Sequence, residues 1–105
     1  MKAIGTDFSS RFKTGDILRH FKRDADGKGT KHLYVYIGIA RHSETSERLA
    51  VYKALYGDGI LYVRPEESFF GRVNKERHPE ARQEFRFESA DAGDLDAVKK
   101  AADIE

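Results

Sequence analysis

The sequence contains no cysteine and no tryptophan, only two prolines, and no long apolar run. Without cysteine the chain cannot form a disulfide, act through a thiolate nucleophile or offer a thiolate ligand to zinc or an iron–sulfur cluster. Its apolar runs fall far short of the roughly 20 residues that a membrane helix requires. Charges at Lys2 and Asp7 interrupt the amino terminus too early for a signal peptide. We therefore expect a cytoplasmic protein with no membrane partner.

The length and composition predict one folded domain. A chain of 105 residues is about the size of one ordinary domain, and 11% aromatic residues argue against disorder. The formal charge of +1 is divided unevenly, because residues 88–105 carry −4 and the rest therefore carries +5. We expect a single domain over residues 1–105, ending in an acidic, helical tail over 88–105. The basic residues of the body alternate with acids, which weakens the case for nucleic-acid binding.

Period-2 patterning of apolar residues indicates a β-rich chain. The predicted strands cover residues 16–21, 33–40, 48–55, 60–64 and 84–88. Within residues 33–40, the aliphatic residues Leu33, Val35, Ile37 and Ile39 alternate with Tyr34 and Tyr36. We expect the aliphatic set to face the core, since successive side chains of a strand point to opposite faces.

The connections between the strands carry clear turn signals. Residues 23–31 are polar and lack an apolar anchor, which predicts a mobile hairpin loop. The turn Gly57-Asp58-Gly59 predicts a second hairpin, and a tight turn there would oppose Lys53 to Arg64, which like charges disfavour.

Two helical segments are also predicted. Residues 66–70 suggest a short helical turn that places Phe69 and Phe70 in the core. Asp94 is placed to cap a final helix over residues 95–104, with Leu95, Val98 and Ala102 as its apolar stripe. Short strands joined by hairpins, with little helix, favour a small SH3-like antiparallel β-barrel with a short C-terminal helix.

Four motifs also resemble a small bacterial domain family. They are Arg19-His20-Phe21, the run from Gly38 to Thr45, the run from Val51 to Gly57, and Val63-Arg64-Pro65. Their order resembles the domain of unknown function numbered sixteen fifty-three, over about residues 15–87. The resemblance implies a compact β domain. It implies no reaction and no catalytic residue, and the loop 23–31 and the tail 88–105 depart from the family pattern.

The same motifs supply the candidate ligand-binding residues. A tyrosine side chain offers a flat apolar ring and a hydroxyl group, and an arginine side chain can bind a carboxylate or phosphate through two hydrogen bonds. We expect a binding or accessory module that takes an anionic small molecule, nucleotide or peptide. The tyrosines could equally be packing residues in strands. The candidate residues are Arg41, His42, Glu44, Tyr52, Tyr56 and Arg64, with His20 beside them.

Other function classes stay open as alternatives. His42 or His20 could act as a general acid or base, with Glu44 orienting a partner, so an enzyme is one alternative. Ser43 lacks a nucleophile elbow, and neighbouring residues cannot form a triad, which disfavours hydrolysis. An RNA- or DNA-binding module is the second alternative. The histidine spacings fit no metal motif, so no metal and no cofactor are expected, and the oligomeric state stays open.

Overall fold

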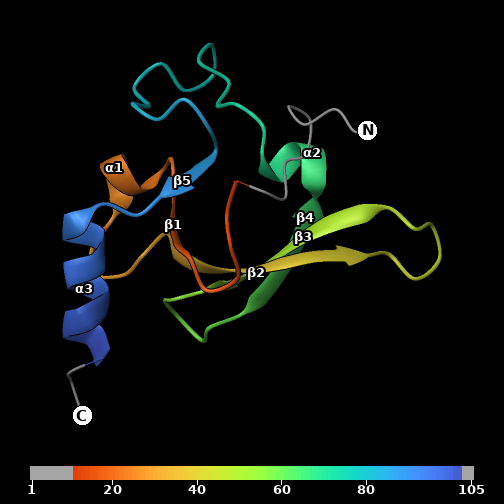
Figure 1. The fold of residues 1–105 in the computed structure, drawn as a ribbon. Helices are drawn as coiled ribbons and strands as arrows, with labels where there is room; N and C mark the ends of the chain where they lie inside the picture. The colour runs from red at the N-terminus through yellow and green to blue at the C-terminus, as the bar shows by residue number, and fades with distance from the viewer. Residues whose placement is uncertain (1–10, 103–105) are drawn as a thin grey trace.

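The computed structural model describes residues 11–102 as a bent sheet with short helices at its ends (Figure 1). In chain order the elements are β1 (Ile17–His20), α1 (Arg23–Asp26), β2 (Leu33–Arg41), β3 (Arg48–Ala54), β4 (Leu61–Pro65), α2 (Glu66–Phe69), β5 (Phe87–Ser89) and α3 (Ala92–Ala102). The predicted β-rich architecture with a C-terminal helix is confirmed. No helix in the described range has the length and apolar character needed to cross a bilayer.

The five strands form one antiparallel sheet in the order β4-β3-β2-β1-β5. Within residues 11–102 the sheet is open, because β4 and β5 are its two edges and do not pair with each other. The predicted closure into an SH3-like barrel is therefore not confirmed. The short β5 has only three residues, and residues 71–86 between α2 and β5 join it to the sheet as a long irregular connection.

The β3–β4 hairpin adopts the looser of the two registers considered from the sequence. Lys53 lies opposite Leu61, and Arg64 lies opposite Ala50, so the two like charges are not paired. The turn uses left-handed glycines, with φ of 60° at Gly57 and 70° at Gly59. Those values suit glycine because it has no Cβ to clash in that region.

The core face of β2 is the tyrosine face, so the prediction that Val35 and Ile37 face the core is wrong. Tyr34 and Tyr36 are 7% and 2% exposed, whereas Ile37 is 38% exposed. A bulge between Tyr36 and Gly38 adds one residue to β2, and beyond it Ile39 packs against the core. A bulge reverses the alternation of faces, which explains why one strict period could not fit the whole strand.

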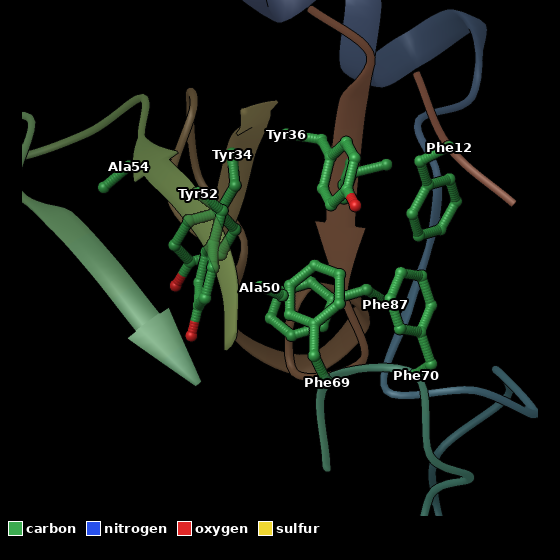
Figure 2. Packing of buried hydrophobic residues seen from close by; sticks show 10 residues of the cluster. Phe12, Tyr34, Tyr36, Ala50, Tyr52, Ala54, Phe69, Phe70 and Phe87 are labelled. Carbon is green, nitrogen blue, oxygen red and sulfur yellow. The ribbon is translucent and has the colours of Figure 1, made fainter. Parts of the chain in front are cut away.

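Aromatic rings make up most of the core. The Phe69 and Phe87 rings stack with their centroids 4.3 Å apart, and both side chains are buried. The Phe12 ring stacks on the Phe70 ring, with their centroids 5.7 Å apart (Figure 2). The helical turn predicted over residues 66–70 is confirmed as α2, and it delivers Phe69 and Phe70 to the core.

The segment predicted as a mobile loop, residues 23–31, contains helix α1 and is tied to the rest of the chain. The Arg23 guanidinium donates to the carbonyl oxygens of Gly29 and Lys31, at 3.0 and 2.7 Å. Its Nε also donates to the Asp94 carboxylate at 2.5 Å. The prediction of an unanchored loop is therefore wrong, because an arginine rather than an apolar residue supplies the anchor.

Helix α3 begins at Ala92, three residues earlier than predicted, and Asp91 caps it. The Asp94 amide donates to the Asp91 carboxylate, and the Asp91 amide donates to the Asp94 carboxylate, which is a reciprocal capping box. Asp94 itself is only 3% exposed and pairs with Arg19 and Arg23, while Leu95 is 48% exposed. The helix therefore docks through a buried carboxylate rather than through the predicted apolar stripe.

Candidate functional site

The structure separates the predicted site residues into two groups. Arg41, His42 and Glu44 lie at the turn between β2 and β3, which projects away from the other elements (Figure 1). His20, Tyr52, Tyr56 and Arg64 come instead from β1, β3, the β3–β4 turn and β4. The second group gathers around the aromatic core.

The side chains of Arg41 and His42 form hydrogen bonds with the backbone of the β2–β3 turn. Nδ1 of His42 accepts the backbone N–H groups of Glu44 and Thr45, at 3.1 and 3.3 Å. Arg41 donates to the carbonyl oxygen of Ser46 at 3.2 Å. Glu44 thus contacts His42 through its backbone N–H rather than through its carboxylate.

An open depression of about 370 Å³ lies beside this turn, but its charges are mixed. Arg48 forms two hydrogen bonds with the Glu66 carboxylate across it, at 2.9 and 3.1 Å. Glu47 and Glu67 line it together with Arg41. This depression therefore already contains the carboxylates that its arginines could bind.

The tyrosines form a second cluster on the core face of the sheet. The Tyr34 and Tyr56 hydroxyls lie 2.6 Å apart, and the Tyr62 ring stacks on the Tyr52 ring with a centroid distance of 5.7 Å. Burial, together with the hydrogen bond to Tyr56, raises the pKa of the Tyr34 hydroxyl. In Figure 2 the hydroxyls of Tyr34 and Tyr52 point to the same side of the cluster. The Tyr34 hydroxyl therefore stays protonated at neutral pH.

Two half-buried guanidinium groups meet at the edge of this cluster. Arg64 donates to the Ser68 hydroxyl at 3.0 Å and approaches the Tyr52 hydroxyl at 3.5 Å. Arg86 donates to the Ser68 carbonyl oxygen at 3.0 Å. Burial, and then the charge of Arg64, lower the pKa of the Arg86 guanidinium. Within the described part of the chain neither arginine forms an ion pair with a carboxylate.

His20 lies on the same side of the core. Its ring contacts the rings of Phe21, His32 and Phe87, with centroids 4.4, 5.9 and 5.1 Å away. Its Nδ1 accepts the backbone N–H of Lys22 at 3.1 Å, so the neutral ring carries its proton on Nε2. Burial, helped by the positive charges of His32, Arg86, Lys22 and Arg64, lowers the pKa of His20 to about 3.

We call this group the arginine–tyrosine site. It consists of His20, Tyr34, Tyr52, Tyr56, Tyr62, Arg64 and Arg86. Sequence reasoning named His20, Tyr52, Tyr56 and Arg64 as candidates but did not include Tyr34, Tyr62 or Arg86. The alternation of Glu84-Phe85-Arg86-Phe87-Glu88 is typical of a strand with one charged, solvent-exposed face, and it gives no sign that Arg86 is half-buried. Arg86 is instead half-buried, and its guanidinium donates to the Ser68 carbonyl oxygen next to α2.

Acid is expected to destabilise the fold through His20. An unfolded histidine titrates near 6.5, whereas the folded His20 titrates near 3. Between these values the unfolded chain binds a proton that the folded chain does not, so the free energy of unfolding falls as pH decreases. At about 1.4 kcal/mol per pKa unit, and allowing for partial solvent contact, we expect a loss of about 2 kcal/mol between about pH 7 and about pH 4.5.

Urea unfolding of the wild type and a His20→Gln variant across this pH range measures the contribution, because carboxylates titrate in both proteins. The wild type should lose more stability than His20→Gln as pH falls. His42→Gln is the matched control, since it removes a half-buried imidazole at the β2–β3 turn, away from the aromatic core. Identical pH profiles for wild type and His20→Gln would contradict the prediction.

The arrangement defines a small antiparallel β-sheet protein with a cationic, aromatic site, and among residues 11–102 no carboxylate pairs with the arginines of that site. In residues 11–102 no three histidine, aspartate or glutamate side chains gather closely enough to hold a metal ion. The family described as a protein of unknown function (DUF1653) matches residues 16–89, and the chain belongs to that family. No curated protein and no solved structure gives a significant match.

The family match covers all five strands and the arginine–tyrosine site, whose members lie between residues 20 and 86. Helix α3 lies beyond residue 89 and outside the matched range. The family resemblance seen in the sequence is therefore confirmed, and it places the candidate site within the family's own domain.

Proposed function

We propose that the protein is a binding module whose arginine–tyrosine site takes a ligand bearing a carboxylate or phosphate group. The observation that carries the proposal is the meeting of Arg64 and Arg86 at Ser68 without a carboxylate partner among the described residues. Two half-buried cations repel each other, and a bound anion would relieve that repulsion. An anionic small molecule, a nucleotide and an acidic peptide all offer such a group.

The neighbouring polar groups suit the same ligand. A guanidinium donates two parallel hydrogen bonds to a carboxylate or phosphate, and a charge-assisted hydrogen bond is stronger than a neutral one. The tyrosine hydroxyls and the Nε2–H of neutral His20 add donors that carry no charge. The half-exposed Tyr62 ring, stacked on Tyr52, offers a flat surface for the rest of the ligand.

The low pKa of His20 also favours binding over general acid–base catalysis. A catalytic acid or base works best with a pKa near the working pH, and His20 is neutral and weakly basic at pH 7. His42 is engaged with the backbone of its own turn. Neither histidine therefore supports the enzyme alternative as well as the two arginines support an anion site.

Replacing either arginine should weaken binding at least about tenfold, because a hydrogen bond to a charged group contributes roughly 1.5–3 kcal/mol. The experiment is an amide chemical-shift titration of the full chain with inorganic phosphate, a mononucleotide, succinate and an acidic peptide. Arg64→Gln and Arg86→Gln are compared with Arg41→Gln, which removes the same charge at the distant β2–β3 turn.

Saturable shifts at Ser68 and Tyr62 that Arg41→Gln retains and the other two variants lose would support the proposal. Shifts that cluster instead around Arg41, or that all three variants reduce equally, would contradict it. A response to RNA alone that weakens steeply with salt would favour the nucleic-acid alternative, since phosphate contacts release counterions.

A further inference from the structure

The edge strand β4 carries an uninterrupted run of exposed apolar side chains. Ile60, Leu61, Tyr62 and Val63 are 50%, 60%, 40% and 59% exposed. Across residues 11–102 the other exposed large hydrophobic residues, Ile37 and Leu95, stand apart in the sequence. An exposed apolar edge strand is a template with which a strand of another chain can pair.

The backbone of β4 also has hydrogen-bonding groups on its outer edge that do not pair with β3. The Ala54 amide donates to the Ile60 carbonyl, so the alternating ladder directs the backbone groups of Tyr62 and Arg64 toward β3. The amide and carbonyl groups of Leu61 and Val63 therefore point away from the sheet.

Proteins commonly protect such an edge with a charged residue, a proline or a bulge. Residues 60–63 have none of these, and Arg64 and Pro65 come only at the end of β4. Residues 60–63 therefore have no feature that would prevent another strand from pairing with this edge.

We propose that β4 pairs antiparallel with β4 of a second copy of this chain, around a two-fold axis at Tyr62. This register places Leu61 opposite Val63 of the partner subunit and Tyr62 opposite Tyr62 of the partner subunit. The outward amides and carbonyls of Leu61 and Val63 then all find partners. Two five-stranded sheets become one continuous sheet.

The strand itself argues for a second copy as the occupant. In this register aliphatic residues meet aliphatic residues on the outer face, and tyrosine meets tyrosine on the other, which are favourable cross-strand pairs. Arg64 lies opposite Ile60 of the partner subunit, so no like charges face each other. An isologous pairing needs such self-complementarity, and the uncharged residues 60–63 provide it.

The oligomeric state of the full chain tests the proposal. Light scattering after size exclusion should give twice the 12.0 kDa of one chain, with dissociation on dilution. Leu61→Glu and Val63→Lys should each shift the protein toward the monomer, because each buries an unpaired charge at the interface. Leu95→Glu is the control, since it replaces an exposed leucine on α3, away from β4, and should leave the dimer intact.

Mixing the two edge variants tests the register. A Leu61→Glu chain paired with a Val63→Lys chain brings the two introduced charges opposite each other, so the mixture should form a heterodimer that neither variant forms alone. The side chains of Leu61 and Val63 lie on the face opposite Tyr62 and Arg64, so anion binding tests the arginine–tyrosine site separately.

A wild-type chain that is monomeric at every concentration, or a dimer that Leu61→Glu and Val63→Lys leave intact, would overturn the proposal. So would failure of the mixture to associate when both variants give well-dispersed amide spectra. Retention of an added β-strand peptide by a monomeric wild type would overturn it as well, in favour of a different protein as the partner.

Discussion

Replacing Asp94 with alanine is expected to lower the free energy of unfolding by about 3 kcal/mol, near the lower end of the range for a broken buried ion pair. The Asp94 carboxylate accepts hydrogen bonds from Arg19 at 2.7 Å and from Arg23 at 2.5 Å. Its side chain is 4% exposed, and those of Arg19 and Arg23 are 14% and 10% exposed. Without Asp94, two largely buried cations would remain close together.

The same change removes half of the capping box, because the Asp91 amide donates to the Asp94 carboxylate. Urea unfolding monitored by circular dichroism measures the loss. Asp96→Ala is the matched control on α3, since Asp96 pairs with Lys100 on the surface and such pairs contribute about 0.3–0.5 kcal/mol. Equal losses for Asp94→Ala and Asp96→Ala would contradict the anchoring role of Asp94.

Replacing Phe87 with alanine is expected to cost about 4 kcal/mol, because a buried phenylalanine leaves both a lost transfer energy and a cavity. Phe87 is 2% exposed and stacks on Phe69. Its ring also meets the edges of Tyr34 and Tyr52, at centroid distances of 5.6 and 5.2 Å. The change should therefore loosen the arginine–tyrosine site as well as the core.

Phe85→Ala is the control for this loss of an aromatic ring. Phe85 lies two residues earlier, is half-exposed, and is covered by the Arg11 and Arg72 guanidiniums at 4.3 and 4.9 Å. Its removal should cost about 1 kcal/mol, the scale of an exposed cation–π contact. Thermal unfolding of both variants makes the comparison, and a smaller loss for Phe87→Ala than for Phe85→Ala would be the contrary outcome.

The local pattern predicted β1 to β4 well because alternation and turn glycines act over a few residues, whereas β5 overlaps the predicted strand 84–88 only at residues 87 and 88. The hairpin at Gly57 and Gly59 and the turn carrying Phe69 and Phe70 both follow from such local signals. The core face of β2 did not follow, because hydrophobicity alone ranks Val35 and Ile37 above Tyr34 and Tyr36. The buried tyrosines pack against rings from β3, α2 and β5, and those contacts are not visible in the sequence of β2.

The long-range ionic contacts were likewise beyond local reasoning. Asp94 has the sequence context of a helix cap, and only the fold brings it to Arg19 and Arg23, more than 70 residues away. Arg86 alternates with Glu84 and Glu88 in the sequence, which is the pattern of a solvent-exposed strand face. Its approach to Arg64 depends on where α2 and β5 meet, which no short-range period encodes.

The clustering of the tyrosines has a spectroscopic consequence. All five tyrosines of the chain lie in or against the aromatic core, and the sequence has no tryptophan to mask them. Ultraviolet emission from the unlabelled protein therefore originates from one small region. Quenching or recovery of that emission would report events at the arginine–tyrosine site directly, without a fluorophore attached.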